Sequence, residues 1–116
     1  MQILMKNGFS AADAGEQRID TAQDALDLIA QARYEHNCGA LIVRKENLCA
    51  DFFALSSGLA GEILQKFSNY RAQLAVVGDF SQFESKALRD FILESNQAGS
   101  ILFVDSPQSA LDHWSR

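Results

Sequence analysis

The sequence predicts a single α/β domain with a mixed, mainly parallel sheet flanked by about four helices. Three short apolar runs, Ala40 to Val43, Leu74 to Val77 and Ile101 to Val104, have the continuous hydrophobicity of strands that are covered on both faces. Segments with the periodicity of amphipathic helices separate these runs. Because strands that alternate with helices are joined by right-handed crossovers, we expect the three strands to be parallel.

The first residues carry the weakest pattern. Ile3 to Lys6 is typical of a short strand, Asn7-Gly8 offers a turn, and the small residues Ala11 to Gly15 show little periodicity. A second short strand is expected near Gln17 to Ile19.

The first helix has a clear start and a clear end. Either Asp20 or Thr21 can cap it, and Thr21 with Asp24 has the spacing of a capping box. The helix should end around Asn37. Its apolar stripe comprises Ala22, Ala25, Leu26, Ile29 and Ala32.

The stretch DFFALSSGLAGEILQKFSNY, Asp51 to Tyr70, organises the rest of the chain. A hydroxyl of Ser56 or Ser57 can accept hydrogen bonds from the first turn of a helix, so we expect one of them as N-cap and a helix that begins near Gly58. The predicted apolar face comprises Leu59, Ile63, Leu64 and Phe67, and Glu62 with Lys66 forms an i,i+4 pair on the wet face.

Two glycines in one helical turn need an explanation. Each costs about 1 kcal/mol relative to alanine inside a helix. Gly58 and Gly61 therefore indicate close approach by another part of this chain, by a ligand or by a partner. Ahead of this helix, Leu48 to Leu55 is predicted to be an irregular connector whose Phe52 and Phe53 lie under it.

The second half repeats the strand and helix alternation. Ser81 and Glu84 have capping-box spacing and predict the start of a helix, with Lys86 and Asp90 paired on its wet side. Ser106-Pro107 begins the last helix, since proline is tolerated at the first helical position. The core-facing positions expected in these two helices are Ala87, Leu88, Phe91, Ile92, Ala110, Leu111 and Trp114.

Composition narrows the function classes. The chain has 116 residues, of which 47% are hydrophobic, so it should fold without a metal, a cofactor or a disulfide. Cys38 and Cys49 come without a secretory signal, and no apolar run approaches the roughly 20 residues of a membrane span. We expect a cytoplasmic protein with reduced thiols. The net charge of −5 argues against a nucleic-acid partner.

The string DFFALSSGLAGEILQKFSNY, with DALDLIA before it and LAVVGDFS, SKALRDFILESN and ILFV after it, closely resembles a bacterial family catalogued as domain of unknown function 4180. The resemblance covers nearly the whole chain and is weakest before Ile19. It implies no activity.

The predicted order of elements also resembles, more distantly, the STAS domains, which include anti-sigma-factor antagonists. In those domains a serine at the corresponding helix start is phosphorylated by a partner kinase, and the resemblance implies that Ser56 or Ser57 has this role. An aspartate usually precedes the STAS serine, whereas Leu55 precedes Ser56 and the nearest aspartate is Asp51. Fold likeness alone does not imply function.

Common catalytic motifs are missing. GLAGEI lacks the lysine of a phosphate-binding loop and the third glycine of a dinucleotide fingerprint. His36, Cys38 and His113 are too few and too scattered for a metal site, so we predict none. Cys49 could be activated near a helix start, but a small buried hydrophobe is the commoner role for such a cysteine.

The candidate site follows from position. Ligands of parallel α/β sheets gather beyond the carboxyl ends of the strands, where this chain places Lys45 to Asn47, Gly78-Asp79 and Asp105 beside the helix-start serines. Turn and capping chemistry is the alternative explanation for both aspartates. The candidate binding residues are Asp51, Ser56, Ser57, Gly58, Gly61, Glu62, Gln65, Lys66 and Asp79.

Three functions remain open. The first is a non-enzymatic regulatory module that binds a protein partner through the Ser56 to Lys66 helix face and the rim at the strand ends. The second is a small-molecule binder or enzyme that uses a rim of Ser56, Ser57 and Asp79. The third is a structural subunit of a homo-oligomer.

Overall fold

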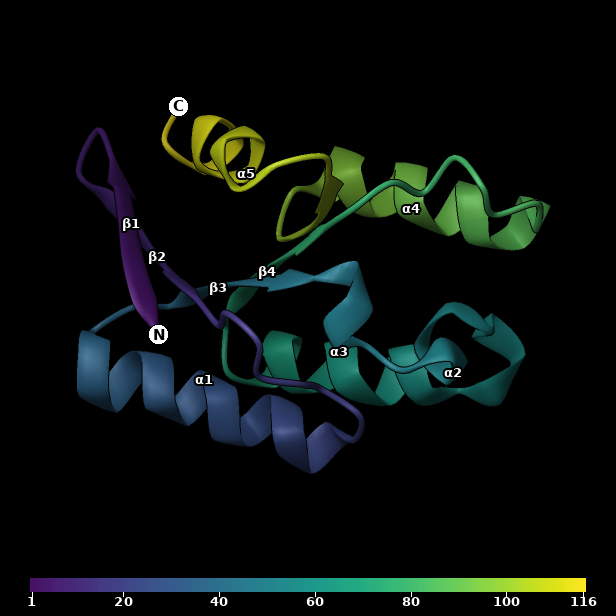
Figure 1. The fold of residues 1–116 in the computed structure, drawn as a ribbon, viewed down its shortest axis with the longest axis horizontal. Coiled ribbons are helices and arrows are strands. Elements are labelled where there is room, and N and C mark those ends of the chain that lie inside the picture. Colours follow the sequence, from purple (N-terminus) through teal and green to yellow (C-terminus); the bar gives the residue numbers. More distant parts are fainter.

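The computed structural model describes residues 1–116 and contains five strands and five helices. Figure 1 shows the course of the chain. The strands are β1 (Gln2–Lys6), β2 (Phe9–Asp13), β3 (Ala40–Arg44), β4 (Gln73–Val77) and β5 (Ile101–Val104). The helices are α1 (Ala22–His36), α2 (Ala50–Phe53), α3 (Leu59–Asn69), α4 (Lys86–Ala98) and α5 (Pro107–Trp114).

All five strands form one mixed sheet in the order β1-β2-β3-β4-β5. β1 runs antiparallel to β2, and every later neighbour pair is parallel. The predicted fold class and the parallel arrangement of the three buried runs are therefore confirmed. β1 and β5 are the two edges of the sheet.

Helices cover the two faces of the sheet unequally. Leu41 and Val43 of β3 join the larger core cluster, to which α1 and α3 contribute. Ala40 and Ile42, which point the other way, join a smaller cluster sealed by α5. α1 and α3 lie side by side (Figure 1), and α4 packs along β5. One face thus carries several helices, and α5 covers the other.

The caps of α1 form as the sequence predicts. The Thr21 side chain accepts a hydrogen bond from the Asp24 backbone N–H, and the Asp24 carboxylate accepts one in return from the N–H of Thr21. Asn37 ends the helix in the left-handed conformation. The predicted Lys86–Asp90 pair on α4 also forms, at 2.6 Å.

The second strand does not lie where the sequence pattern placed it. β2 spans Phe9–Asp13, and of the predicted segment Gln17 to Ile19 only Ile19 makes an isolated bridge, to Leu48. Alanine is depleted in strands, which hides β2 from a propensity argument. Ala11 and Ala12 are fully buried there, where small side chains let helices pack close to the sheet.

The start of α4 was also predicted wrongly. Ser85 is the N-cap, and its hydroxyl accepts a hydrogen bond from the Leu88 backbone N–H. Ser81, the predicted cap, donates instead to Asp79 within a turn. The helix thus starts four residues later than expected. Ala87, predicted to face the core, is exposed, while Leu88 is buried as predicted.

The connector before α3 is more regular than expected. It contains the single helical turn α2, it follows a 3₁₀ turn at Lys45–Asn47, and it leads into a second 3₁₀ turn at Leu55–Ser57. Phe52 is buried in the larger core cluster, as predicted. α2 brings the count of helices to five instead of four.

Candidate functional site

The start of α3 is capped by a glycine rather than by a serine. Gly58 is the N-cap residue and has φ of 80°, a conformation in which a side chain is strained. The Ser57 hydroxyl accepts from the Leu59 N–H at 3.2 Å and donates to the Asp51 carbonyl oxygen at 2.7 Å. The preceding 3₁₀ turn carries Ser57 one position too early for a standard N-cap. Ser57 thus ties α2 to α3, whereas the exposed Ser56 hydroxyl makes no hydrogen bond.

Gly61 has no packing role within this chain. It is exposed in the first turn of α3, and a Cβ built on it would meet no atom within 4 Å. Close packing of the helix on the sheet therefore does not explain this glycine. Glycine still carries its helix cost of about 1 kcal/mol at such a position.

The remaining predicted residues of α3 lie around Gly61. Glu62 and Gln65 are exposed, and Gln65 donates to the side chain of Asn69 at 2.7 Å. Lys66 is half-buried, and the predicted ion pair between Glu62 and Lys66 does not form. We name the surface of Ser56, Gly58, Gly61, Glu62 and Gln65 the α3 face.

Lys45 crosses the carboxyl end of β4. Its Nζ donates to the Asp79 carbonyl oxygen at 2.9 Å and lies 5.7 Å from the centre of the Phe83 ring. A Cβ on Gly78 would lie 2.8 Å from the Cβ of Lys45, so glycine is required for this crossing. Lys45 and Asp79 are thus brought together as predicted, through the backbone of Asp79.

The Asp79 carboxylate is committed to its own turn. The Ser81 hydroxyl donates to it at 2.6 Å and the Ser81 backbone N–H at 2.9 Å. These hydrogen bonds hold the pKa of Asp79 below its ordinary value, and the bond from the Ser81 hydroxyl has the larger effect. Turn chemistry, the alternative explanation, accounts for this residue.

Aromatic rings occupy the space between α2 and the loop that follows β4. Phe53 of α2 stacks on Phe83 with ring centres 5.0 Å apart, and Phe80 lies within 6.4 Å of both. Phe80 also contacts Phe103 of β5 edge-on. We name Phe53, Phe80 and Phe83, all half-buried, the aromatic cluster. With Lys45 they fill the predicted ligand position, and the cavities of the molecule lie elsewhere.

An ion pair at the ends of β2 and β3 was not predicted from the sequence. Asp13, which is 6% exposed, accepts from both terminal nitrogens of Arg44, at 2.9 and 3.2 Å, and from the Gly15 N–H. Asp105, also expected at this end, accepts from the Ser109 hydroxyl at 2.8 Å. Both aspartates thus hold strand ends in place. The sequence signal that could have predicted the ion pair is Asp13 itself, which directly follows the alanines Ala11 and Ala12.

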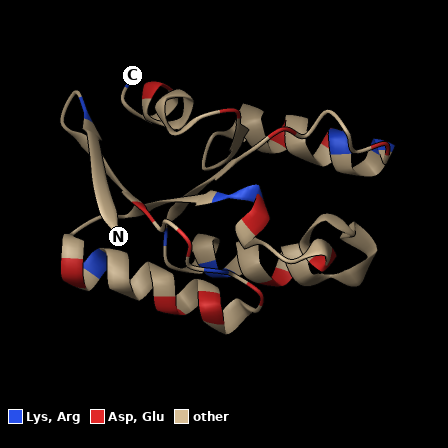
Figure 2. Cartoon of the chain, in the orientation of Figure 1, with Lys and Arg blue, Asp and Glu red and all other residues tan.

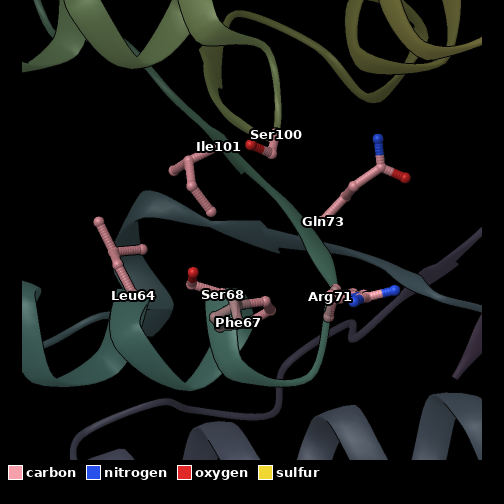
Figure 3. Close-up of a pocket in the computed structure, with 8 residues that line it drawn as sticks. Leu64, Phe67, Ser68, Arg71, Gln73, Ser100 and Ile101 are labelled. Carbon is pink, nitrogen blue, oxygen red and sulfur yellow. The ribbon is translucent and has the colours of Figure 1, made fainter.

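A cavity of about 330 Å³ lies at the opposite end of the strands, where β4 and β5 begin. Leu64 of α3 and Ile101 of β5 face each other across it (Figure 3), and the Ser68 hydroxyl points into the same space. A second cavity of similar volume lies along α1 beside Tyr34 and Tyr70. Neither contains any of the predicted binding residues.

The thiols and imidazoles do not gather. Cys38 is buried with its Sγ 3.6 Å from the Ser10 hydroxyl, and Cys49 is half-buried. No three His, Cys, Asp or Glu side chains come together in a way that could hold a metal ion. Figure 2 shows acidic and basic positions interspersed along the chain, and no helix is both long and apolar enough to cross a membrane.

Comparison with protein families gives one match. The model of the family described as Domain of unknown function (DUF4180) matches residues 7–114. The chain belongs to this family. No curated protein and no solved structure matches the chain. The likeness to STAS domains therefore stays a prediction, and the family description assigns no activity.

Proposed function

We propose that this chain is a non-enzymatic binding module that docks a protein partner through the α3 face and the adjoining aromatic cluster. The observation that carries the proposal is Gly61, a helix-weakening residue with empty space around it. Since nothing within the chain uses that space, a closely approaching partner is the reason we assign to it.

The surroundings of Gly61 fit a protein partner. α2 lies against the start of α3 (Figure 1), and its Phe53 continues the surface with half-buried aromatic rings. Aromatic residues are enriched in the centres of protein interfaces. The filled end of the sheet argues against the alternative of a small molecule held by Ser56, Ser57 and Asp79, because small ligands are bound in concave sites.

Ser56 is the point at which we place regulation. Its hydroxyl is exposed and makes no hydrogen bond, whereas modification of Ser57 would break the bond to Asp51 that ties α2 to α3. A phosphate on Ser56 would bring about −1.5 to −2 charges to the α3 face. Added charge at an interface alters both partner choice and association rate.

The test compares partner capture by matched variants. The chain is immobilised, proteins retained from an extract of its source cells are identified, and the binding constant is measured with the purified partner. Gly61→Gln should weaken binding by roughly tenfold or more, equal to about 1.4 kcal/mol, because the side chain occupies the docking space. Ala87→Gln, in the exposed first turn of α4, is the control and should bind like wild type.

Regulation is tested separately with Ser56→Asp. This variant should keep the fold and change the affinity for the same partner by more than Ser56→Ala does, because Ser56→Ala removes the hydroxyl without adding charge. Equal binding by wild type, Gly61→Gln and Ser56→Asp, or the lack of any specifically retained protein, would refute the proposed function.

A further inference from the structure

The sheet protects one of its edges with a side chain. At the β5 edge the Phe103 backbone N–H donates to Oδ1 of Asn96 at 2.7 Å, and Nδ2 of Asn96 donates to the Phe103 carbonyl oxygen at 3.2 Å. The carboxamide thus takes the place of a neighbouring strand. Such blocking prevents sheets from pairing edge to edge.

The β1 edge has no such protection. Lys6 pairs with Phe9 across the two-residue turn, so Lys6, Leu4 and Gln2 exchange backbone hydrogen bonds with β2. Residues of β2 therefore alternate between bonding to β1 and bonding to β3. Ala14 fits this alternation, because its N–H donates to the Ile42 carbonyl oxygen of β3. The backbone N–H and C=O groups of Ile3 and Met5 therefore point outward from the sheet.

The side chains of β1 also favour pairing. Met5 is 67% exposed on this edge. β1 contains no proline and pairs with β2 through five consecutive residues without a bulge. Its one charge, Lys6, forms an ion pair with Asp112 of α5. The usual devices against edge pairing are missing from this strand.

We propose that β1 pairs with β1 of a second copy of this chain, antiparallel, so that two five-stranded sheets become one continuous sheet in a homodimer. Of the registers that match outward-pointing groups, the one centred on Leu4 pairs all five residues of the strand. Ile3 then lies opposite the partner's Met5, and Gln2 opposite the partner's Lys6.

A second copy is the occupant that the edge itself specifies. A two-fold axis at Leu4 lets each strand satisfy the other with the same backbone groups, which is the self-complementarity of a two-fold interface. The register places no like charges opposite each other, since Lys6 meets a glutamine. The proposal does not depend on the α3 face and can hold or fail independently of it.

The oligomeric state in solution is the first test. Wild type should sediment as a dimer, with a monomer fraction that grows over a roughly hundredfold dilution, because dimerisation follows mass action. Met5→Pro removes one outward N–H without touching a bond to β2 and should be monomeric. Met5→Thr keeps the N–H and a residue that favours strands, and should remain dimeric. A monomeric wild type, or a dimeric and folded Met5→Pro, would overturn the proposal.

Cross-linking tests the register and does not require Met5→Pro to fold. In a Cys49→Ser background, Leu4→Cys brings two thiols together at the two-fold axis, where opposite Cα atoms are about 4.5 to 5.5 Å apart. It should form a covalent dimer on mild oxidation. Gln2→Cys is the control, because its two copies would be about 13 Å apart, beyond the ~7 Å limit of a disulfide. Equal cross-linking of both variants, or of neither, would contradict the register.

Discussion

Replacing the two glycines at the start of α3 by alanine should change stability in opposite directions. Gly61 is helical, exposed and surrounded by empty space, so Gly61→Ala should stabilise the chain by about 0.5 to 1 kcal/mol. Gly58 has φ of 80°, where a side chain costs roughly 1 to 2 kcal/mol, so Gly58→Ala should destabilise it.

These free energies convert to measurable shifts in melting temperature. With 116 residues, the unfolding entropy near the melting temperature is about 0.24 kcal/mol/K. Gly61→Ala should therefore raise the midpoint by about 2 to 4 °C, and Gly58→Ala should lower it by about 4 to 8 °C. Differential scanning calorimetry measures both.

The direction in which Gly61→Ala shifts the melting temperature tests whether the chain itself requires glycine at this position. A fall in midpoint would mean that the native helix requires glycine there for a reason inside the chain, and the case for a partner at Gly61 would be lost. A rise, combined with weaker partner binding, would show stability given up for docking, a trade that functional surfaces often show.

Three further predictions concern single side chains. Asn96→Ala should cost about 1 to 3 kcal/mol in urea unfolding, because both backbone groups of Phe103 lose their partner; an unchanged midpoint would contradict the edge cap. Ser81→Ala should raise the pKa of Asp79 toward 3.8, as followed by carboxyl NMR. The pKa of Asp79 is lower in the folded than in the unfolded chain, so its hydrogen bond to Ser81 stabilises the fold above the unfolded pKa, and this stabilisation is lost as the pH falls through the folded pKa. Wild type and variant should therefore converge in stability near pH 2. A difference in stability that stays constant down to that pH would refute the assignment. Phe52→Ala should cost about 3 to 5 kcal/mol by the same denaturant assay, since the ring is 1% exposed, and a loss below about 1 kcal/mol would mean that α2 is not part of the core.

Elements marked by strong local chemistry could be predicted from the sequence. The three apolar runs became β3, β4 and β5, and Thr21 and Ser106 cap the helices as expected. β2 could not be found by propensity, because its alanines are chosen for close packing with distant helices. The Asn7-Gly8 turn, however, was a hairpin signal that pointed to a strand directly after it.

The candidate site was harder to predict because its geometry depends on competition between neighbouring groups. Ser56 or Ser57 was expected to cap α3, yet Gly58 takes that place because a 3₁₀ turn precedes it. The Ser81 hydroxyl donates to the Asp79 carboxylate instead of capping a helix, and Ser85 is the N-cap of α4. Such outcomes depend on three-dimensional positions that residue spacing does not encode. The aromatic cluster likewise unites segments far apart in sequence.

The position of α5 has a consequence for how the chain is made. Strand order follows sequence order, so each strand lies beside the strand that is synthesised before it. The face that holds Ala40, Ile42 and Leu102 stays uncovered until α5, the final helix, arrives. α5 then also fastens the first hairpin, through Asp112 to Lys6 and through the ring of Trp114 to that of Phe9. A chain truncated before Pro107 would therefore expose the apolar residues of this sheet face, and exposed apolar surface makes a chain prone to aggregation.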